Sequence, residues 1–224
     1  MKKRVLVIAP HPDDETLGCG GTILKHRRSG EEVHWLIATA MTRAGGFAPA
    51  RIARRKAEIR AVAGLYGFES VREAGFPAAR LEGVPVSRLI AGFGAILGEV
   101  RPDWVYLPHR GDIHTDHRVV FDAAASCLKW FRGGPVERVL SYETLSETDL
   151  ALDPGGTPFR PNVFVDVSEH LDRKIAIMKV YGSEMGPFPF PRSPEAIRAL
   201  AAVRGASSGF RAAEAFMLLR EARP

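Results

Sequence analysis

The chain has 224 residues, and its apolar fraction of 46% and charged fraction of 25% are those of an ordinary soluble globular protein. This length suffices for one large α/β domain with a substantial core, so we expect a single domain over residues 1–224. The net charge of +5 mildly favours anionic partners. The basic residues are scattered, however, and no known nucleic-acid-binding motif accompanies them, so nucleic-acid binding is not expected. The first apolar run stops within a few residues at His11, which argues against a signal peptide or a transmembrane segment.

The two cysteines, Cys19 and Cys127, both lie inside apolar helical patterns. We expect them to be reduced core thiols rather than a disulfide, which suits a cytoplasmic protein.

The first predicted strand, 4–9, leads directly into a polar cluster of one histidine and three acids at 11–15. A proline and acids suit the first turn of a helix. If a helix begins here, His11 and Asp14 are three residues apart and can converge on one point, while Asp13 is turned to an adjacent direction. An imidazole and a carboxylate that converge at the end of a strand indicate a metal site, although an N-capping cluster would also use such residues.

The helix predicted over 16–28 contains Gly18, Gly20 and Gly21, which are poor helix formers. Their spacing matches neither G-x-G-x-x-G nor the Walker pattern, so close packing on a sheet is favoured over a phosphate-binding loop.

A second strand is predicted over 32–40, and the loop 41–49 that follows it is a candidate lid facing the substrate, with Arg43 in it. The next predicted helix, 50–66, is amphipathic and basic. Arg55 belongs to its basic face, which we expect to be mostly solvated. The expected buried stripe consists of Ile52, Ile59, Val62 and Leu65.

A short strand at 71–74 and a helix at 85–100 precede a second buried strand at 103–107. That strand is followed by another crowd of histidines and carboxylates at 109–117. A His-x-x-His pair with an Asp between can bring one histidine to a metal and leave the other free for proton transfer. A solvated loop with a capping Asp116 would explain one of these residues, but not the whole cluster.

The remaining predicted elements alternate in the same way. We expect a proline- and glycine-rich connection over 146–161. We also expect an aromatic, proline-rich loop at 185–191, which could cover the active site or an oligomer contact. The predicted elements are a helix at 117–131, a strand at 136–143, a strand at 162–167, a helix capped by Ser168 and running to about 182, a helix at 194–203, and a last strand or helix at 214–219.

Strands that alternate with helices of this length predict a mostly parallel sheet covered on both faces. We therefore expect an α/β protein with a Rossmann-like three-layer α/β/α sandwich. Such sheets bind ligands at the carboxyl ends of their strands, where both polar clusters fall.

The segment Ala9–Glu15, together with His114–His117, resembles the two signature motifs of the PIG-L/LmbE-like family of zinc-dependent N-acetylglucosaminyl deacetylases. Gly75-Phe76-Pro77 and the segment 209–216 are similar to further segments of that family. The resemblance implies the same layered fold, an acetamido-sugar substrate, one zinc ion per chain with other divalent metals as alternatives, and an association into homo-oligomers. Many relatives carry an Asp directly after the Pro77 position. This chain has Ala78 there, which puts ordinary sugar recognition in question.

Spacing and resemblance together make His11, Asp14 and His117 the expected metal ligands, with one coordination position left for water. Asp13 is the expected general base, and His114, if protonated, would stabilise the oxyanion; either of the two could protonate the leaving amine. Asp116 is expected to orient a neighbouring imidazole, and it could cap the helix as well. Arg43 and Arg55 are the expected substrate contacts.

Three other functions stay open from the sequence. The same site could cleave a different amide, for example in a thiol conjugate. The chain could be a zinc-containing sugar-binding module without turnover, although binding alone does not need a base. A doubly wound sheet could also bind a nucleotide through the glycines at 18–21.

Overall fold

The computed structural model describes residues 2–152, 156 and 158–223. Its strands are β1 (Arg4–Ala9), β2 (Glu32–Ala40), β3 (Ser70–Pro77), β4 (Trp104–Pro108), β5 (Arg138–Tyr142), β6 (Val163–Asp166) and β7 (Ala213–Glu221). They form a seven-stranded sheet in the order β3-β2-β1-β4-β5-β7-β6. The first five strands pair in parallel, and β7 runs antiparallel to both β5 and β6. The predicted mostly parallel sheet is confirmed.

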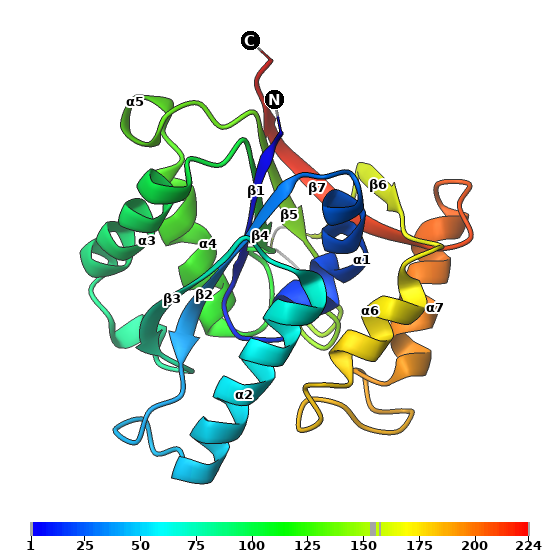
Figure 1. Ribbon diagram of the computed structural model, residues 1–224, viewed down its shortest axis with the longest axis horizontal. Helices are drawn as coiled ribbons and strands as arrows, with labels where there is room; N and C mark the ends of the chain where they lie inside the picture. The colour runs from blue at the N-terminus through cyan, green and yellow to red at the C-terminus, as the bar shows by residue number, and fades with distance from the viewer. Residues whose placement is uncertain (1, 153–155, 157, 224) are drawn as a thin grey trace.

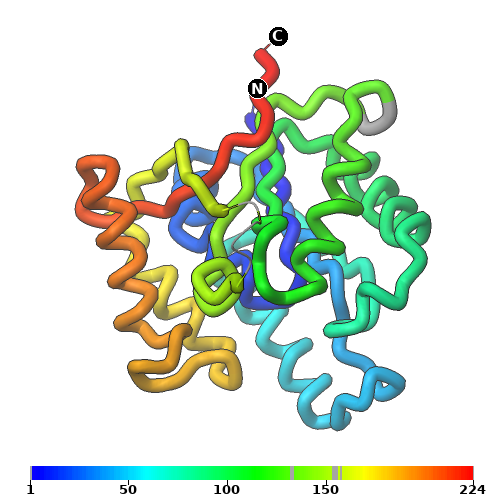
Figure 2. The backbone as a smooth tube through the Cα atoms, turned by 180° about the vertical axis from the view of Figure 1, so that it is seen from behind, coloured from blue at the N-terminus to red at the C-terminus, as the bar shows by residue number. Residues whose placement is uncertain are grey.

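The helices are α1 (Asp14–Arg28), α2 (Pro49–Tyr66), α3 (Val86–Val100), α4 (Thr115–Cys127), the short α5 (Trp130–Gly133), α6 (Leu171–Met178) and α7 (Pro194–Ala206), with a 3₁₀ turn at Leu81–Gly83. Helices α3 and α4 pack on one face of the sheet, and α1, α2, α6 and α7 pack on the other. Seen from behind, the α3–α4 and α6–α7 pairs flank the sheet on opposite sides (Figure 2). The three-layer sandwich expected from the sequence is therefore present (Figure 1).

Strand β1 is apolar along its length, and its side chains point alternately to the two faces of the sheet, which explains why both faces are covered. Val5 and Val7 point into the core shared with α1, α2 and α6, whereas Leu6 and Ile8 point into the core shared with α3 and α4. Because successive side chains of a strand point to opposite faces, a strand that is apolar throughout must be buried on both sides.

Several element boundaries differ from the sequence prediction. The predicted strand 71–74 extends to Pro77, and the predicted helix 117–131 is divided, since α4 ends at Cys127 before α5 begins. Helix α6 begins at Leu171, later than predicted, because the Ser168 hydroxyl donates to the Asp166 carboxylate and does not cap the helix. The C-terminal segment, which was open between strand and helix, is the strand β7.

The buried face of α2 is rotated relative to the predicted stripe. Ile59 and Val62 are buried as expected, but Leu65 is 37% exposed. Arg55 and Glu58, which a hydrophobic pattern cannot identify, are buried instead. The expectation of a solvated Arg55 was therefore wrong, because this side chain finds acidic partners within the protein.

The glycines of α1 serve close packing, as predicted. A Cβ atom on Gly18 would lie 2.2 Å from the ring of Tyr142, and one on Gly21 would lie 2.6 Å from Val167. Only a residue without a side chain allows α1 to approach these neighbours.

A buried ion pair from the C-terminal half of the chain binds backbone groups of helix α1. The Glu214 carboxylate of β7 accepts hydrogen bonds from the backbone N–H groups of Gly21 and Thr22, both at 2.7 Å. Lys174 of α6 donates to Glu214 at 2.7 Å and to the carbonyl oxygen of Leu17 at 2.8 Å. These contacts tie α1 to both α6 and β7.

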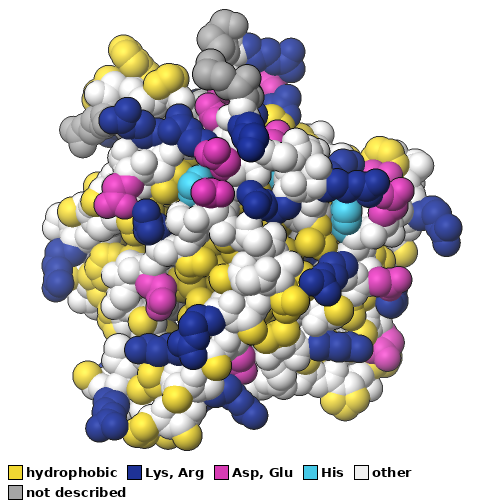
Figure 3. Space-filling model, viewed as in Figure 1, with side chains coloured by type: hydrophobic (Ala, Val, Ile, Leu, Met, Phe, Trp, Pro, Cys, Tyr) yellow, Lys and Arg dark blue, Asp and Glu magenta, His cyan; other side chains and the backbone are white. Residues whose placement is uncertain are grey.

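Two further expectations concern the whole chain. Cys19 and Cys127 are buried and form no disulfide with each other, as predicted. No helix among the described residues combines the length and the apolar character needed to cross a bilayer. On the face drawn in Figure 3, lysine and arginine side chains are spread among other residues and do not gather in one patch.

Candidate metal centre and cavity

The two polar clusters meet where β1 and β4 lie side by side. The sheet order runs outward from this pair in both directions, so a crevice forms between their carboxyl ends. Cluster 11–15 leaves β1 and cluster 109–117 leaves β4. Strand β1 begins, and strand β7 finishes, at the opposite end of the sheet from these clusters (Figure 1).

A strained turn connects β1 to α1. Asp13 has a φ angle of 136°, which is unusual for a residue with a side chain and costs about 1–3 kcal/mol. Its backbone N–H donates to Glu15 Oε2 at 2.9 Å, and the N–H of His11 donates to Asp14 Oδ2 at 2.8 Å. The turn therefore fixes the directions of three functional groups, at 11, 13 and 14.

Two imidazoles converge on the Asp14 carboxylate. His11 Nδ1 and His117 Nε2 each lie 3.4 Å from Asp14 Oδ2. One ligand atom from each of these three residues lies within 4.8 Å of the other two, although they come from opposite ends of a hundred-residue span. This group could hold a metal ion.

The far nitrogen of each imidazole is held by a buried carboxylate. Asp116 Oδ2 lies 2.9 Å from His11 Nε2, and Asp112 Oδ2 lies 2.7 Å from His117 Nδ1. Asp116 also accepts the backbone N–H groups of Ala79 and Leu81. A second group of potential ligands, His11 with His114 and Asp116, is thus already engaged in hydrogen bonds.

These contacts set the charges of the three converging residues. Burial lowers the pKa of His11 and His117, but the carboxylates beside them outweigh it and raise the pKa to about 9 and about 10. Burial alone would raise the pKa of Asp14, yet the two imidazoles hold it well below the ordinary value. Without a metal, the imidazoles carry the positive charge that a cation would otherwise supply.

His114 stacks near both imidazoles, with its ring centroid 4.5 Å from that of His11 and 5.5 Å from that of His117. It forms the N-cap of α4, because its Nδ1 accepts the backbone N–H of Asp116 at 3.1 Å. The capping role considered for Asp116 therefore belongs to His114. Burial and the neighbouring imidazoles lower the pKa of His114 to about 4, so at pH 7 it is neutral and carries its proton on Nε2.

An arginine that belongs to no motif of the sequence holds Asp13. Arg192 Nη1 donates to Asp13 Oδ2 at 2.8 Å, and Nη2 donates to Glu147 Oε1 at 2.9 Å. Burial and the charge of Asp14 raise the pKa of Asp13 to about 8, against the opposing effect of Arg192. The only sequence signal for Arg192 is its position directly after the aromatic loop 185–191, for which coverage of the active site and an oligomer contact were both open.

A cavity of about 260 Å³ opens beside these groups. His11, Asp13 and His114 line one end of it, and α2 forms a wall. Arg55 lines the cavity too, but its guanidinium is bound by the protein: it donates to the carbonyl oxygen of Pro12 at 2.6 Å and pairs with Glu184. Arg43 is exposed and is not among the described residues that line the cavity. Two other residues of its loop, Met41 and Phe47, do line it.

Known proteins resemble this chain over most of its length. Residues 6–128 match the family described as "PIG-L: GlcNAc-PI de-N-acetylase". A diacetylchitobiose deacetylase of Thermococcus kodakarensis is 29% identical over 95% of this chain and 81% of its own length. A 2'-N-acetylparomamine deacetylase of Streptomyces fradiae is 28% identical over 81% of this chain and 73% of its own length.

A solved structure has the same architecture. The crystal structure of a conserved protein from Thermus thermophilus superposes with a TM-score of 0.77. It is 26% identical to this chain, and the match covers 99% of this chain and 97% of the other.

Proposed function

The chain belongs to the PIG-L family, and from that premise we propose that it is a metal-dependent N-deacetylase that hydrolyses the acetamide of an N-acetylglucosamine-type sugar. Its reaction cleaves a carbon–nitrogen bond and yields acetate and an amino sugar. The relatives named above are a deacetylase of diacetylchitobiose and a deacetylase of 2'-N-acetylparomamine, which supports this substrate class. The observation that carries this proposal is the meeting of His11, Asp14 and His117 beside Asp13 at the end of an open cavity.

His11, Asp14 and His117 are the residues that would hold the metal, and zinc suits them best. Two imidazole nitrogens and one carboxylate oxygen form a common donor set of catalytic zinc sites. The carboxylates of Asp112 and Asp116 behind the imidazoles support the same choice, since zinc-binding histidines usually donate their other N–H to such a partner. When bound, the ion lowers the pKa of a water molecule to roughly 7 and polarises the amide carbonyl.

Asp13 acts as the base that takes a proton from the attacking water. Its Oδ2 is held by Arg192, which leaves Oδ1 to face the water. Burial and the charge of Asp14 raise the pKa of Asp13 above its ordinary value and so strengthen it as a proton acceptor, while Arg192 favours its charged form. Asp13 can therefore accept this proton and then return it to the leaving nitrogen as the carbon–nitrogen bond breaks. Because His114 is neutral at pH 7, we assign the return of the proton to Asp13.

His114 stabilises the oxyanion that forms on the carbonyl oxygen. Its Nδ1 already accepts a backbone N–H, so its Nε2–H is free to donate. A neutral donor of this kind contributes to the transition state because the oxyanion exists only there. Asp116 supports both partners, since its side chain holds His11 and its backbone N–H holds His114.

Acetate release tests the proposal. The protein, loaded with Zn²⁺, is incubated with free, nucleotide-linked and lipid-linked N-acetylglucosamine, and acetate is measured before and after treatment with a chelator. We expect release that stops on chelation and returns when Zn²⁺ is added. Release that is unaffected by metal removal would contradict the metal assignment, and no release from any acetamido sugar would contradict the function.

A further inference from the structure

The cavity extends beyond the proposed catalytic groups, and we call the part lined by α2 and by the ends of β2 and β3 its outer half; its walls are mainly apolar, with charged side chains at the mouth. Beyond Asp13 and His114 it continues between α2 and the ends of β2 and β3. The side chains that line this part include Met41, Phe47, Ile52 and Ile59, and the wall near β2 and β3 is formed by Ala40 and Ala78.

Sugar hydroxyls would find few neutral polar partners there. Apart from His114 beside the catalytic groups, Thr39 is the one neutral polar side chain among the described residues that line the cavity, and its hydroxyl already donates to the carbonyl oxygen of Pro10 at 2.8 Å. Hydroxyl groups buried against such a surface lose hydrogen bonds to water without replacement. The lining therefore suits an apolar group attached to the sugar better than a second, fully hydroxylated sugar ring.

The mouth of this outer half carries unpaired positive charge. The inner arginines, Arg55 and Arg192, are neutralised by buried acids. Arg51 and Lys56 are exposed and form no ion pair within the described part of the chain, and Arg51 lies over the Phe47 ring at 5.5 Å from its centroid. Glu73 is the opposing acid on the lining, so the mouth keeps one net positive charge.

We propose that the outer half of the cavity binds an apolar substituent of the acetamido sugar that ends in an anionic group. This inference rests on the proposed deacetylase function and specifies its substrate class. Phe47 and Ile52 contact the apolar body of the substituent, and Arg51 pairs with its charge.

Three synthetic substrates separate the two features of the substituent. They are N-acetylglucosamine, its phenyl glycoside and its 4-carboxyphenyl glycoside, each glycoside being made as both anomers so that the better anomer is compared. We expect kcat/KM to rise roughly tenfold with the phenyl group, mostly through KM, because the ring leaves water for an apolar wall. The carboxylate should add about a threefold increase, as expected for a partly exposed ion pair.

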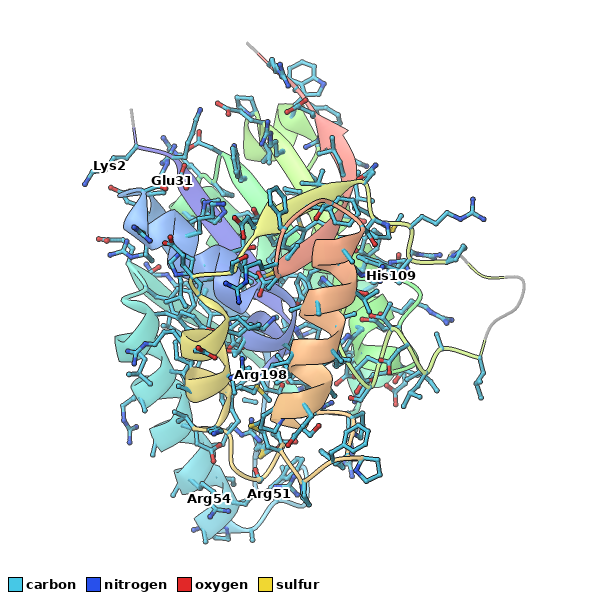
Figure 4. The ribbon with its side chains drawn as sticks, turned by 90° about the vertical axis from the view of Figure 1, so that its right-hand side faces the viewer. Lys2, Glu31, Arg51, Arg54, His109 and Arg198 are labelled. Carbon is cyan, nitrogen blue, oxygen red and sulfur yellow. The ribbon has the colours of Figure 1, made fainter. Side chains whose placement is uncertain are left out.

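Matched variants locate each gain. Phe47→Ser should abolish the gain from the phenyl group, and Arg51→Gln should abolish only the additional gain from the carboxylate. Arg54→Gln is the control: Arg54 lies at the same end of α2 (Figure 4), pairs with Glu58 at 4.0 Å, and is not among the described lining residues. It should leave both gains intact.

The outcomes distinguish this inference from the function on which it rests. Equal kcat/KM for all three substrates, or gains that survive in Phe47→Ser and Arg51→Gln, would overturn the inference while acetate release still supports the deacetylase. If no acetate appears, calorimetric titration of the zinc-loaded protein with the same compounds still tests the inferred binding of the substituent. Tighter binding of the carboxyphenyl glycoside in the wild type than in Arg51→Gln supports it, and equal binding refutes it.

Discussion

The inner and outer halves of the cavity differ in how their charged side chains are held. At the inner end, each imidazole that faces Asp14 is backed by a carboxylate, and Asp13 is held by Arg192. At the outer end, the charges of Arg51 and Lys56 have no ionic partner in the described chain, and the walls are apolar. Fixed charges suit chemistry, which needs a preorganised geometry, whereas free charges on a rim suit the selection of substrates.

This difference in how the charges are held predicts that substitutions at the inner end abolish turnover, whereas substitutions at the outer end change only which substrate is preferred.

The largest effect should follow removal of a metal ligand. His117→Ala should lose the metal and reduce acetate release roughly a thousandfold or more, because the activated water depends on the ion. Metal content by mass spectrometry and acetate release measure the two consequences.

His34 provides the control for this prediction. It is a buried histidine of β2 that bonds to Ser70, away from the cavity. His34→Ala should keep the metal, and a His117→Ala protein that binds zinc normally would refute the ligand assignment.

The next largest effect should come from the proposed base. Asp13→Asn should retain zinc and lose about 10²–10⁴-fold in kcat, as general-base removal usually does. The amide cannot accept the proton, but it preserves the size of the side chain near Arg192. Measuring kcat together with bound zinc separates this variant from a ligand variant, and an Asp13→Asn enzyme with normal kcat would exclude Asp13 as the base.

The pH dependence of metal binding should be steep. With pKa values of about 9 and about 10, both imidazoles hold protons at pH 7, and a metal must displace them. Zinc affinity should therefore rise with pH, by up to about a hundredfold per pH unit when two protons are released. Titration against a competing chelator at pH 6, 7 and 8 measures this slope.

The metal-free protein should respond to pH in the opposite direction. Because the folded pKa values exceed the ordinary value of 6.5, the imidazoles contribute their stability fully below that pH and lose it as the pH rises through about 9 and about 10. The Tm of the chelator-treated protein should therefore fall between pH 7 and pH 10. A flat zinc affinity combined with a flat Tm would contradict the charge states of the inner end.

The smallest effect should come from the apolar wall. Ala78→Asp should lower KM for unsubstituted N-acetylglucosamine by about threefold, because a carboxylate there accepts a hydrogen bond from a sugar hydroxyl at some cost in desolvation. The kcat value should stay unchanged. Ala78→Val is the control of similar size, and an equal change of KM in both variants would show that the effect is steric.

The sequence was sufficient for the frame of the fold and for the two clusters at its centre. Apolar runs such as 4–9 predict buried parallel strands. Because ligands bind at the carboxyl ends of such strands, the proximity of 11–15 and 109–117 could be predicted before the structure was known. The roles of His11, Asp14 and His117 as ligands remain predictions that metal analysis will test.

Partners that come from irregular segments could not be predicted. Arg192 and Glu147 lie in connections without periodicity, and only the tertiary fold brings them to Asp13 and to each other. Arg55 was expected in solvent because a charged residue on a helix usually lies there. Its burial depends on Glu184, which lies 129 positions further along the chain.

The ion pair that binds the backbone of α1 is completed only at the end of synthesis. Glu214, close to the C-terminus, provides the acceptor for two amides in the helix whose first turn carries Asp14. During translation this helix lacks those partners until nearly the whole polypeptide has left the ribosome. A chain that stops before β7 would keep all three proposed ligands, which lie in the first 117 residues, but would lose the acceptor of these two amides.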